Sequence, residues 1–385
     1  MNVSTSLEIV SAPLGEPLIS DHITNYIMVM TSFVILIFSL PAVVLNNLNV
    51  YIFINTKLDS VTVCFISLAL ADMTSMILLS TNATFYLIHS SGVSWSRNLP
   101  TLTYFVSFLF ILLMDMSSAT TTYIAVQRGL CVTFPFYTRN VFNKNRSLVI
   151  CSIISLVILV CTLPRFATFR LKTLLDPIDN TTTLLVFEYF ESWYSFDSFY
   201  LIFMKSVLAF TEYGIMVVCT VAISIGMRSS LKLKQKSNTY SSETSRGAHS
   251  KKGKEKKDLD DIKSSEKEQA QKKDSKESLV VKQSLIVVLI HVILTTPRIF
   301  VSLFKVFEPR FTLGGQYNNL FFVFFNSINV ADSINAFVNF FVYLTFNSKF
   351  RHYFFHKIYR PVVKNGSSSI LQTSCEIPYL QNTSK

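Results

Sequence analysis

Seven apolar segments, each long enough to cross a lipid bilayer, constrain this chain more than any other feature of its sequence. A membrane-spanning helix needs about 20 mostly apolar residues. The segments that meet this length are Tyr26–Asn55, Val61–His89, Thr101–Val132, Leu148–Phe169, Phe199–Met227, Leu279–Phe307 and Leu320–Phe346. The sequence therefore predicts an all-α membrane protein built on a seven-transmembrane helix bundle.

The composition argues against a set of soluble domains. Half of the 385 residues are hydrophobic, and phenylalanine alone occurs 34 times. A soluble protein has too little interior to bury so much apolar surface. Only 15% of the residues are charged, whereas about a quarter are charged in a typical soluble domain. The composition thus favours a chain that lies mostly in lipid.

Basic residues in the loops indicate the orientation of the chain, because Lys and Arg gather on the cytoplasmic side of membrane proteins. With the N-terminus outside, the inner segments carry Lys57, Arg139, Lys144, Arg146, Lys349, Arg351, Lys357 and Arg360. The outer segments instead carry Asp176, Asp179, Glu188, Glu191 and Asp197. We therefore expect a multi-pass protein of the plasma membrane with its N-terminus outside. Asn2 and Asn180 then lie outside, in sequences that can be glycosylated.

The chain divides into three parts. Residues 1–25 are expected to form an extracellular N-terminus without an evident cleavable signal peptide. Residues 26–346 form the seven-transmembrane domain, and its polar, low-complexity segment 229–278 is expected to be a disordered cytoplasmic loop. Residues 347–385 form the cytoplasmic tail, which opens with a short amphipathic helix at Ser348–Arg360 on the inner leaflet. The net charge of +11 favours contact with membrane lipids rather than nucleic acid.

Polar side chains inside the apolar segments mark candidate functional positions, because a polar group in lipid is costly. Asp72 lies near the middle of the second segment, where its carboxylate needs a hydrogen-bond donor or a cation. Asn46, Ser117, Asn335 and Asn339 are expected at a similar depth. Taken singly, each of these residues is as well explained by a hydrogen-bonded cluster that only holds the helices together.

Motifs in these segments, taken in order, resemble those of the rhodopsin-like G-protein-coupled receptor family. Leu68-Ala69-Leu70-Ala71-Asp72 is similar to the family's LAxAD motif, and Asn339-Phe340-Phe341-Val342-Tyr343 resembles its NPxxY motif. Gln127-Arg128-Gly129 resembles the (D/E)R(Y) triplet. The family positions Asn46, Ser117, Pro135 and Pro297 are also kept. Within the family, the last span and the residues after it look most like molluscan chemosensory and peptide-type receptors.

This resemblance implies a receptor that senses an extracellular ligand and activates a heterotrimeric G protein. It implies that Arg128, Gln127, Asn339 and Tyr343 serve activation and G-protein coupling, with Arg128 as the main inner contact. It also implies a sodium ion as a possible allosteric modulator. The hard oxygen ligands for that ion would come from Asp72, Ser117, Asn335 and Asn339. No other cofactor is expected.

Several positions depart from the family pattern. Gln127 replaces the acidic partner of the arginine, so we expect it to offer Arg128 only a neutral hydrogen bond. Other departures are Phe340 for the proline of the last span, and His291 and Thr295 for two aromatic residues of the sixth. Thr103 replaces the cysteine that usually bonds the second outer loop, and that loop, Leu171–Ser198, contains no cysteine. The usual outer disulfide is therefore expected to be absent.

The candidate ligand contacts are Phe110, Asp115, Arg298, Asn329 and Asp332. Phe110 stands where amine receptors of the family place an aspartate, so a biogenic amine is not expected. Arg298 can bind an anionic group of the ligand, or it can simply be neutralised by Asp332, because buried charges are normally paired. The sequence leaves these two alternatives equal.

Two alternative functional classes are a transporter or channel and an enzyme. A transporter or channel can use the same intramembrane charges for conduction, but no internal repeat of the inverted kind is visible. An enzyme is not expected, because the sequence offers no nucleophile–base pair, Gly-rich phosphate loop or metal triad.

Overall fold

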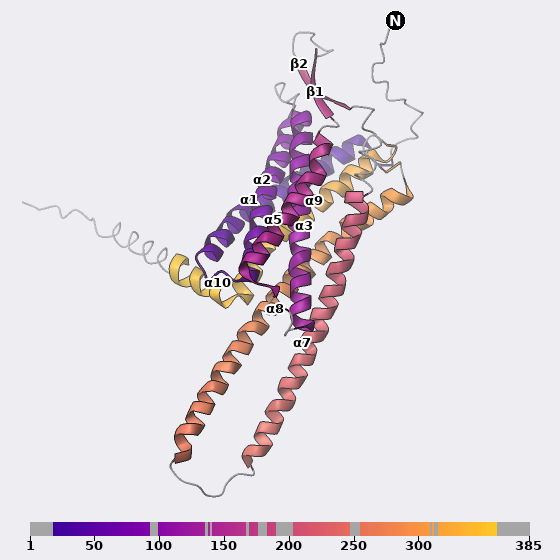
Figure 1. The fold of residues 1–385 in the computed structure, drawn as a ribbon. Helices are drawn as coiled ribbons and strands as arrows, with labels where there is room; N and C mark the ends of the chain where they lie inside the picture. The colour runs from indigo at the N-terminus through magenta and orange to yellow at the C-terminus, as the bar shows by residue number, and fades with distance from the viewer. Residues whose placement is uncertain are drawn as a thin grey trace, which may run out of the picture.

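The computed structural model describes residues 18–92, 99–134, 138, 141–166, 169–175, 183–189, 203–246, 255–308, 310–311 and 315–359. Within these residues, seven helices are long and apolar enough to cross a membrane. They run side by side as one bundle (Figure 1). The predicted bundle of seven membrane-spanning helices is confirmed.

The long helices are α1 (Asp21–Ile54), α2 (Ser60–Ser90), α3 (Leu99–Thr133), α5 (Lys144–Phe166), α7 (Ala209–Arg246), α8 (Glu255–Phe307) and α9 (Asn318–Phe346). A π-helical turn, η3 (Phe203–Leu208), precedes α7. The predicted amphipathic helix is also present, as α10 (Ser348–Tyr353) followed by the π-helical turn η4 (Phe354–Tyr359).

Polar caps set the starts of three helices. The side chains of Ser20, Asp59 and Asn347 accept hydrogen bonds from the free backbone N–H groups at the starts of α1, α2 and α10. Pro297 lies inside α8, as Pro41 and Pro164 do in α1 and α5. Membrane helices tolerate such prolines because neighbouring groups satisfy the freed carbonyls.

A β-hairpin adds to the expected all-α architecture. Strands β1 (Phe169–Leu175) and β2 (Thr183–Tyr189) pair antiparallel, with Phe169 opposite Tyr189 and Leu175 opposite Thr183. The strands are rich in aromatic and aliphatic residues that favour extended pairing. The hairpin lies at one end of the bundle, which we call the hairpin end, and α10 lies at the other, the α10 end (Figure 1).

The expectation of a disordered segment at 229–278 differs from the structure. Helix α7 continues to Arg246, and α8 already begins at Glu255. Both helices extend well beyond the α10 end (Figure 1). The segment is rich in Lys, Glu and Gln, which favour helix, and Glu268 precedes Lys272 by one helical turn. Local helix propensity therefore accounts for the continuation of both membrane helices beyond the bundle.

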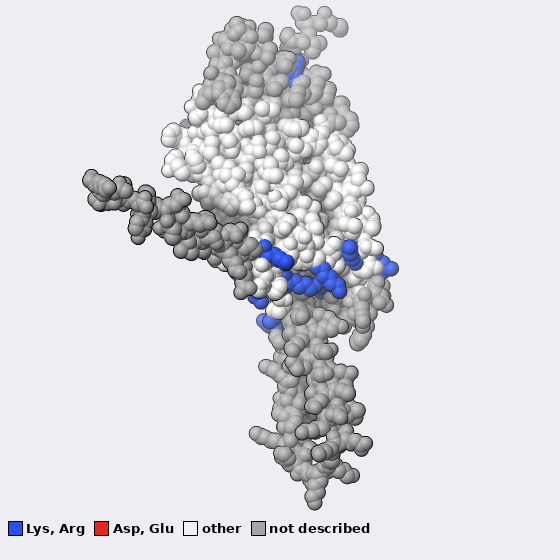
Figure 2. All heavy atoms as spheres, turned by 90° about the vertical axis from the view of Figure 1, so that its left-hand side faces the viewer, with Lys and Arg blue, Asp and Glu red and all other residues white. Residues whose placement is uncertain are grey.

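The surface of the bundle matches a lipid environment. Large apolar side chains such as Val44, Val160 and Ile225 are exposed on its outside. Figure 2 shows a broad uncharged surface with Lys and Arg gathered in a belt below it. The exposed basic residues of the α10 end are Lys57, Lys144, Arg146, Lys349, Arg351 and Lys357.

Candidate functional site

Asp72 is the centre of a buried polar cluster in the middle of the bundle. Its side chain is almost completely buried. Ser117 Oγ, from α3, donates to Asp72 Oδ1 at 2.6 Å, and Asn339 Nδ2, from α9, donates to Asp72 Oδ2 at 2.9 Å. Three of the four predicted sodium ligands are therefore brought together on one carboxylate that links α2, α3 and α9.

The fourth predicted ligand, Asn335 on α9, is instead in contact with His291 on α8. Its Nδ2 lies 3.3 Å from His291 Nδ1. The Oδ1 atoms of Asn335 and Asn339 are both buried and have no hydrogen-bond partner among the described residues. An unsatisfied buried acceptor costs about 1–3 kcal/mol. The free Oδ1 of Asn339, whose Nδ2 bonds the Asp72 carboxylate, and the free Oδ1 of Asn335 on the same helix are the kind of hard oxygen ligands that suit a small cation.

Asn46 has a structural role in the same region. Its Nδ2 donates to the backbone carbonyls of Ala42 and Ala336, both at 3.0 Å, and its Oδ1 accepts from Asn49 Nδ2 at 3.1 Å. These bonds tie α1 to α9. These contacts agree with the alternative in which Asn46 only holds helices together through hydrogen bonds.

Gln127 does not make the hydrogen bond to Arg128 that the sequence led us to expect. Its Nε2 instead donates to the hydroxyls of Ser60 and Ser147, on α2 and α5, and its Oε1 accepts from Cys64 Sγ at 3.7 Å. Successive residues on a helix point in different directions, so the neighbour of Arg128 in sequence faces other helices. The expected restraint of Arg128 by Gln127 is therefore wrong.

Arg128 lies at the α10 end with unused hydrogen-bond donors. Its Nε and Nη2 are buried and have no partner within the described part of the chain. Tyr343 OH, on α9, is also buried without a partner. The Tyr343 ring is fixed by Phe53 and Phe65, with ring centroids 5.1 and 4.9 Å away. Arg128 and Tyr343, two of the four predicted activation residues, thus each have a buried polar group without a hydrogen bond.

Gln283, on α8, is a residue that the motif comparison missed. It is fully buried, and neither its Nε2 nor its Oε1 has a partner among the described residues. The only signal in the sequence was an amide inside the apolar run from Leu279 onward. Together with Arg128 and Tyr343 it gives α3, α8 and α9 an unsatisfied polar side chain at the α10 end.

At the hairpin side of the cluster, Arg298 and Asp332 form an ion pair. Arg298 Nη2 lies 2.5 Å from Asp332 Oδ2, and the two side chains are 24% and 8% exposed. Asp115 and Glu212 also act on the guanidinium electrostatically. Of the two alternatives open from the sequence, the structure shows the neutralising pair, which joins α8 to α9.

Of the other candidate ligand contacts, Phe110 and Asn329 are buried and Asp115 is half-buried. Phe110 is 2% exposed and packs in an apolar cluster with Met76 and Leu79, so its ring is part of the core between the helices. Asn329 is buried on α9. Asn2, Asn180 and Pro135 lie outside the described residues.

The cysteines agree with an absent outer disulfide for the residues that the structure describes. Cys64, Cys131, Cys151, Cys161 and Cys219 are all free thiols. Thr103, at the position of the usual bridging cysteine, lies on α3.

Comparison with known proteins gives one family. A model of the family described as "7 transmembrane receptor (rhodopsin family)" matches residues 46–343, which is most of the chain. The match begins at Asn46 and ends at Tyr343, so it includes the polar cluster and the groups at the α10 end. A search of curated individual proteins gives no match.

Proposed function

The chain belongs to the rhodopsin family of seven-transmembrane receptors, and on that premise we propose that it detects an extracellular ligand and activates a heterotrimeric G protein. It is a multi-pass membrane protein with seven membrane-spanning helices. Members of this family are receptors, so no catalytic reaction is proposed.

One observation carries the proposal: Arg128, Gln283 and Tyr343 are buried at the α10 end with polar atoms that have no partner within the described residues. Buried polar groups are nearly always hydrogen-bonded, and an unmet one needs an explanation. A bundle with a second packing, in which a protein partner supplies acceptors and donors to these groups, explains all three. A ligand that favours that packing would then shift the equilibrium toward it.

The orientation follows from the charges. We place the α10 end in the cytosol, because its exposed residues include Lys57, Lys144, Arg146, Lys349 and Arg351. The hairpin end then faces outward and receives the ligand. A G protein would meet Arg128 from the cytosolic side.

For the ligand, we propose a chemosensory or peptide-like agonist that acts on the ion pair between α8 and α9. Asp115, Arg298, Asn329 and Asp332 are its candidate contacts. Because Arg298 is already paired at 2.5 Å, a charged ligand group would have to compete with Asp332 for the guanidinium. If the ligand replaced Asp332 as the partner of Arg298, α8 would no longer be tied to α9. The ligand would then bind the loosened packing better than the present one, as a shift between two conformations requires.

We also propose that sodium binds at Asp72, Ser117, Asn335 and Asn339. The free Oδ1 atoms of the two asparagines support this site. Bound sodium would supply the positive charge that the buried carboxylate lacks, and it would stabilise the packing that holds it.

The decisive experiment measures two outputs from one preparation. Agonists found by a cell-based screen with a promiscuous G protein are added to purified receptor reconstituted in liposomes with a heterotrimeric G protein. We expect agonist to raise nucleotide exchange, Arg128→Ala to abolish the rise, and solute flux to stay unchanged. Ligand-dependent flux without exchange would instead identify a transporter or channel.

A further inference from the structure

A cavity of about 610 Å³ opens at the α10 end, between the turn that joins α1 to α2 and the junction of α9 with α10. Leu279, Phe346 and Tyr353 contribute accessible apolar surface to its lining, which also includes the rings of Phe53 and Phe65, each 1% exposed. Lys57, Lys349 and His352 also line it and are exposed. The cavity therefore combines an aromatic floor with a basic rim.

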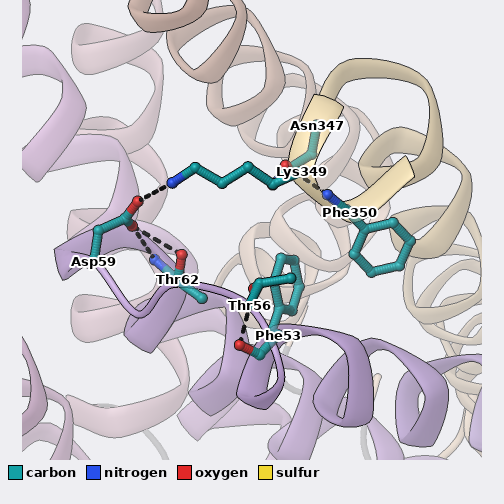
Figure 3. A network of polar contacts seen from close by, with 7 residues as sticks. All are labelled: Phe53, Thr56, Asp59, Thr62, Asn347, Lys349 and Phe350. Atoms are coloured by element: carbon teal, nitrogen blue, oxygen red, sulfur yellow. Dashed lines mark hydrogen bonds and ion pairs between the residues drawn. The ribbon is translucent and has the colours of Figure 1, made fainter. Parts of the chain in front are cut away.

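Asp59 and Lys349 form an ion pair across this rim (Figure 3). Lys349 Nζ lies 3.2 Å from Asp59 Oδ2, and the two side chains are 54% and 50% exposed. The other oxygen of the carboxylate accepts from Thr62 N at 3.0 Å and from Thr62 Oγ1 at 2.8 Å, which caps α2. Exposed ion pairs contribute little to stability, so Lys349 can exchange its partner at small cost while Asp59 keeps the cap.

The rim has more positive than negative charge. Burial alone would raise the pKa of Asp59, but the bonds from Thr62 and the charge of Lys349 hold it below its usual value, so the carboxylate is ionised near neutral pH. Asp59 can balance only one of the two lysines. No ion pair joins Lys57 to another described residue, and Lys57 is exposed. An anion at the rim would therefore meet an uncompensated ammonium group.

We propose that this cavity binds a long-chain fatty acid from the cytosolic side. The acyl chain lies on Leu279, Phe346 and Tyr353, and the carboxylate pairs with Lys57 and with Lys349 after Lys349 leaves Asp59. Pockets of about 300–1,000 Å³ hold one compact ligand. A cavity of this size suits a single acyl chain with one acid group better than a two-chain phospholipid.

Occupancy would also affect activation, and this consequence rests on the proposed function. Phe53 and Phe65 are the rings that hold Tyr343, at centroid distances of 5.1 and 4.9 Å. An acyl chain that fills the cavity lined by these rings would oppose their movement and so stabilise the present position of Tyr343. A fatty acid is therefore expected to lower agonist-stimulated nucleotide exchange.

Binding of radiolabelled palmitate to the purified full-length receptor in an uncharged detergent tests the site without any G protein. Removing both lysines in Lys57→Ala/Lys349→Ala should weaken binding about tenfold, as expected for the loss of two partly exposed charge pairs. Asp59→Asn should instead tighten binding, because it removes the competitor for Lys349 and keeps a residue that caps α2 equally well. Lys357→Ala, an exposed lysine outside the cavity lining, is the matched control and should change nothing.

Two probes complete the test. Hexadecanol, which has the chain but no charge, should bind weakly and without dependence on the lysines. Palmitate binding that is equal in all four proteins, or hexadecanol binding that matches palmitate, would overturn the proposal. Equal competition by a two-chain phosphatidic acid would also overturn it and would assign the basic rim to membrane lipid headgroups. Because these are binding measurements, they remain valid if the receptor proves not to couple to a G protein.

Discussion

Two arginines within the helix bundle of this receptor have opposite environments. Arg298, toward the hairpin end, has a carboxylate 2.5 Å from its guanidinium. Arg128, at the α10 end, has two buried nitrogens without a partner in the described residues. A paired charge holds α8 and α9 in one arrangement, whereas an unpaired one favours any change that brings an acceptor. The difference indicates a bundle that is held toward the hairpin end and, on the proposed function, primed at the α10 end, where a protein partner would bind.

The largest expected effect comes from breaking the ion pair between Arg298 and Asp332. Asp332→Ala leaves Arg298 buried without its partner and should cost about 3 kcal/mol, the lower end of the usual range because Arg298 is partly exposed. Thermal unfolding of the purified receptor measures the loss. The double variant Arg298→Ala/Asp332→Ala should recover most of it, and an equally unstable double variant would show that the ion pair is not what stabilises this region.

The second prediction concerns the unpaired arginine. Arg128→Met removes two unsatisfied donors and introduces an apolar side chain of similar length. The free energy of unfolding should therefore stay equal or rise by about 1–2 kcal/mol. Nucleotide exchange on the G protein should be lost in the same variant. A loss of stability as large as that of Asp332→Ala would mean that Arg128 does have a strong partner, and the contrast between the two arginines would fail.

The third prediction concerns the buried polar cluster around Asp72. Sodium should raise the unfolding temperature of the ligand-free receptor, since an ion at a hundredfold its Kd stabilises by about 2.7 kcal/mol. Asp72→Asn should abolish the rise, and Asp59→Asn, which changes an exposed carboxylate, should keep it. Choline chloride at the same concentration controls for ionic strength. The site is disproved if Asp72→Asn responds to sodium as the unchanged receptor does.

The smallest effect is expected at Gln127. Its amide bonds Ser60 and Ser147, so Gln127→Leu should cost about 1 kcal/mol of stability. Agonist-free exchange should not change, because Gln127 does not hold Arg128. A marked change in basal exchange at equal surface expression would show that the two neighbouring residues are coupled after all.

Much of the polar centre could be expected from the sequence because depth in a membrane helix follows from position. Asp72, Ser117 and Asn339 were placed at a common level by counting along their segments, and they do share hydrogen bonds. The hairpin could not be expected in the same way. Its strands are stabilised by pairing with each other, and that pairing joins residues such as Phe169 and Tyr189 that lie far apart in the chain.

The sequence by itself determined that this chain crosses a membrane seven times, because an apolar run of sufficient length has no other favourable environment. It also determined which polar residues lie at similar depth. Only the tertiary structure decided what each of them faces. The rotation of each helix about its axis is set by packing against its neighbours, and a rotation of one residue turns a side chain by about 100°. That is why Gln127 bonds Ser60 and Ser147 rather than Arg128, and why Arg298 has a partner while Arg128 has none among the described residues.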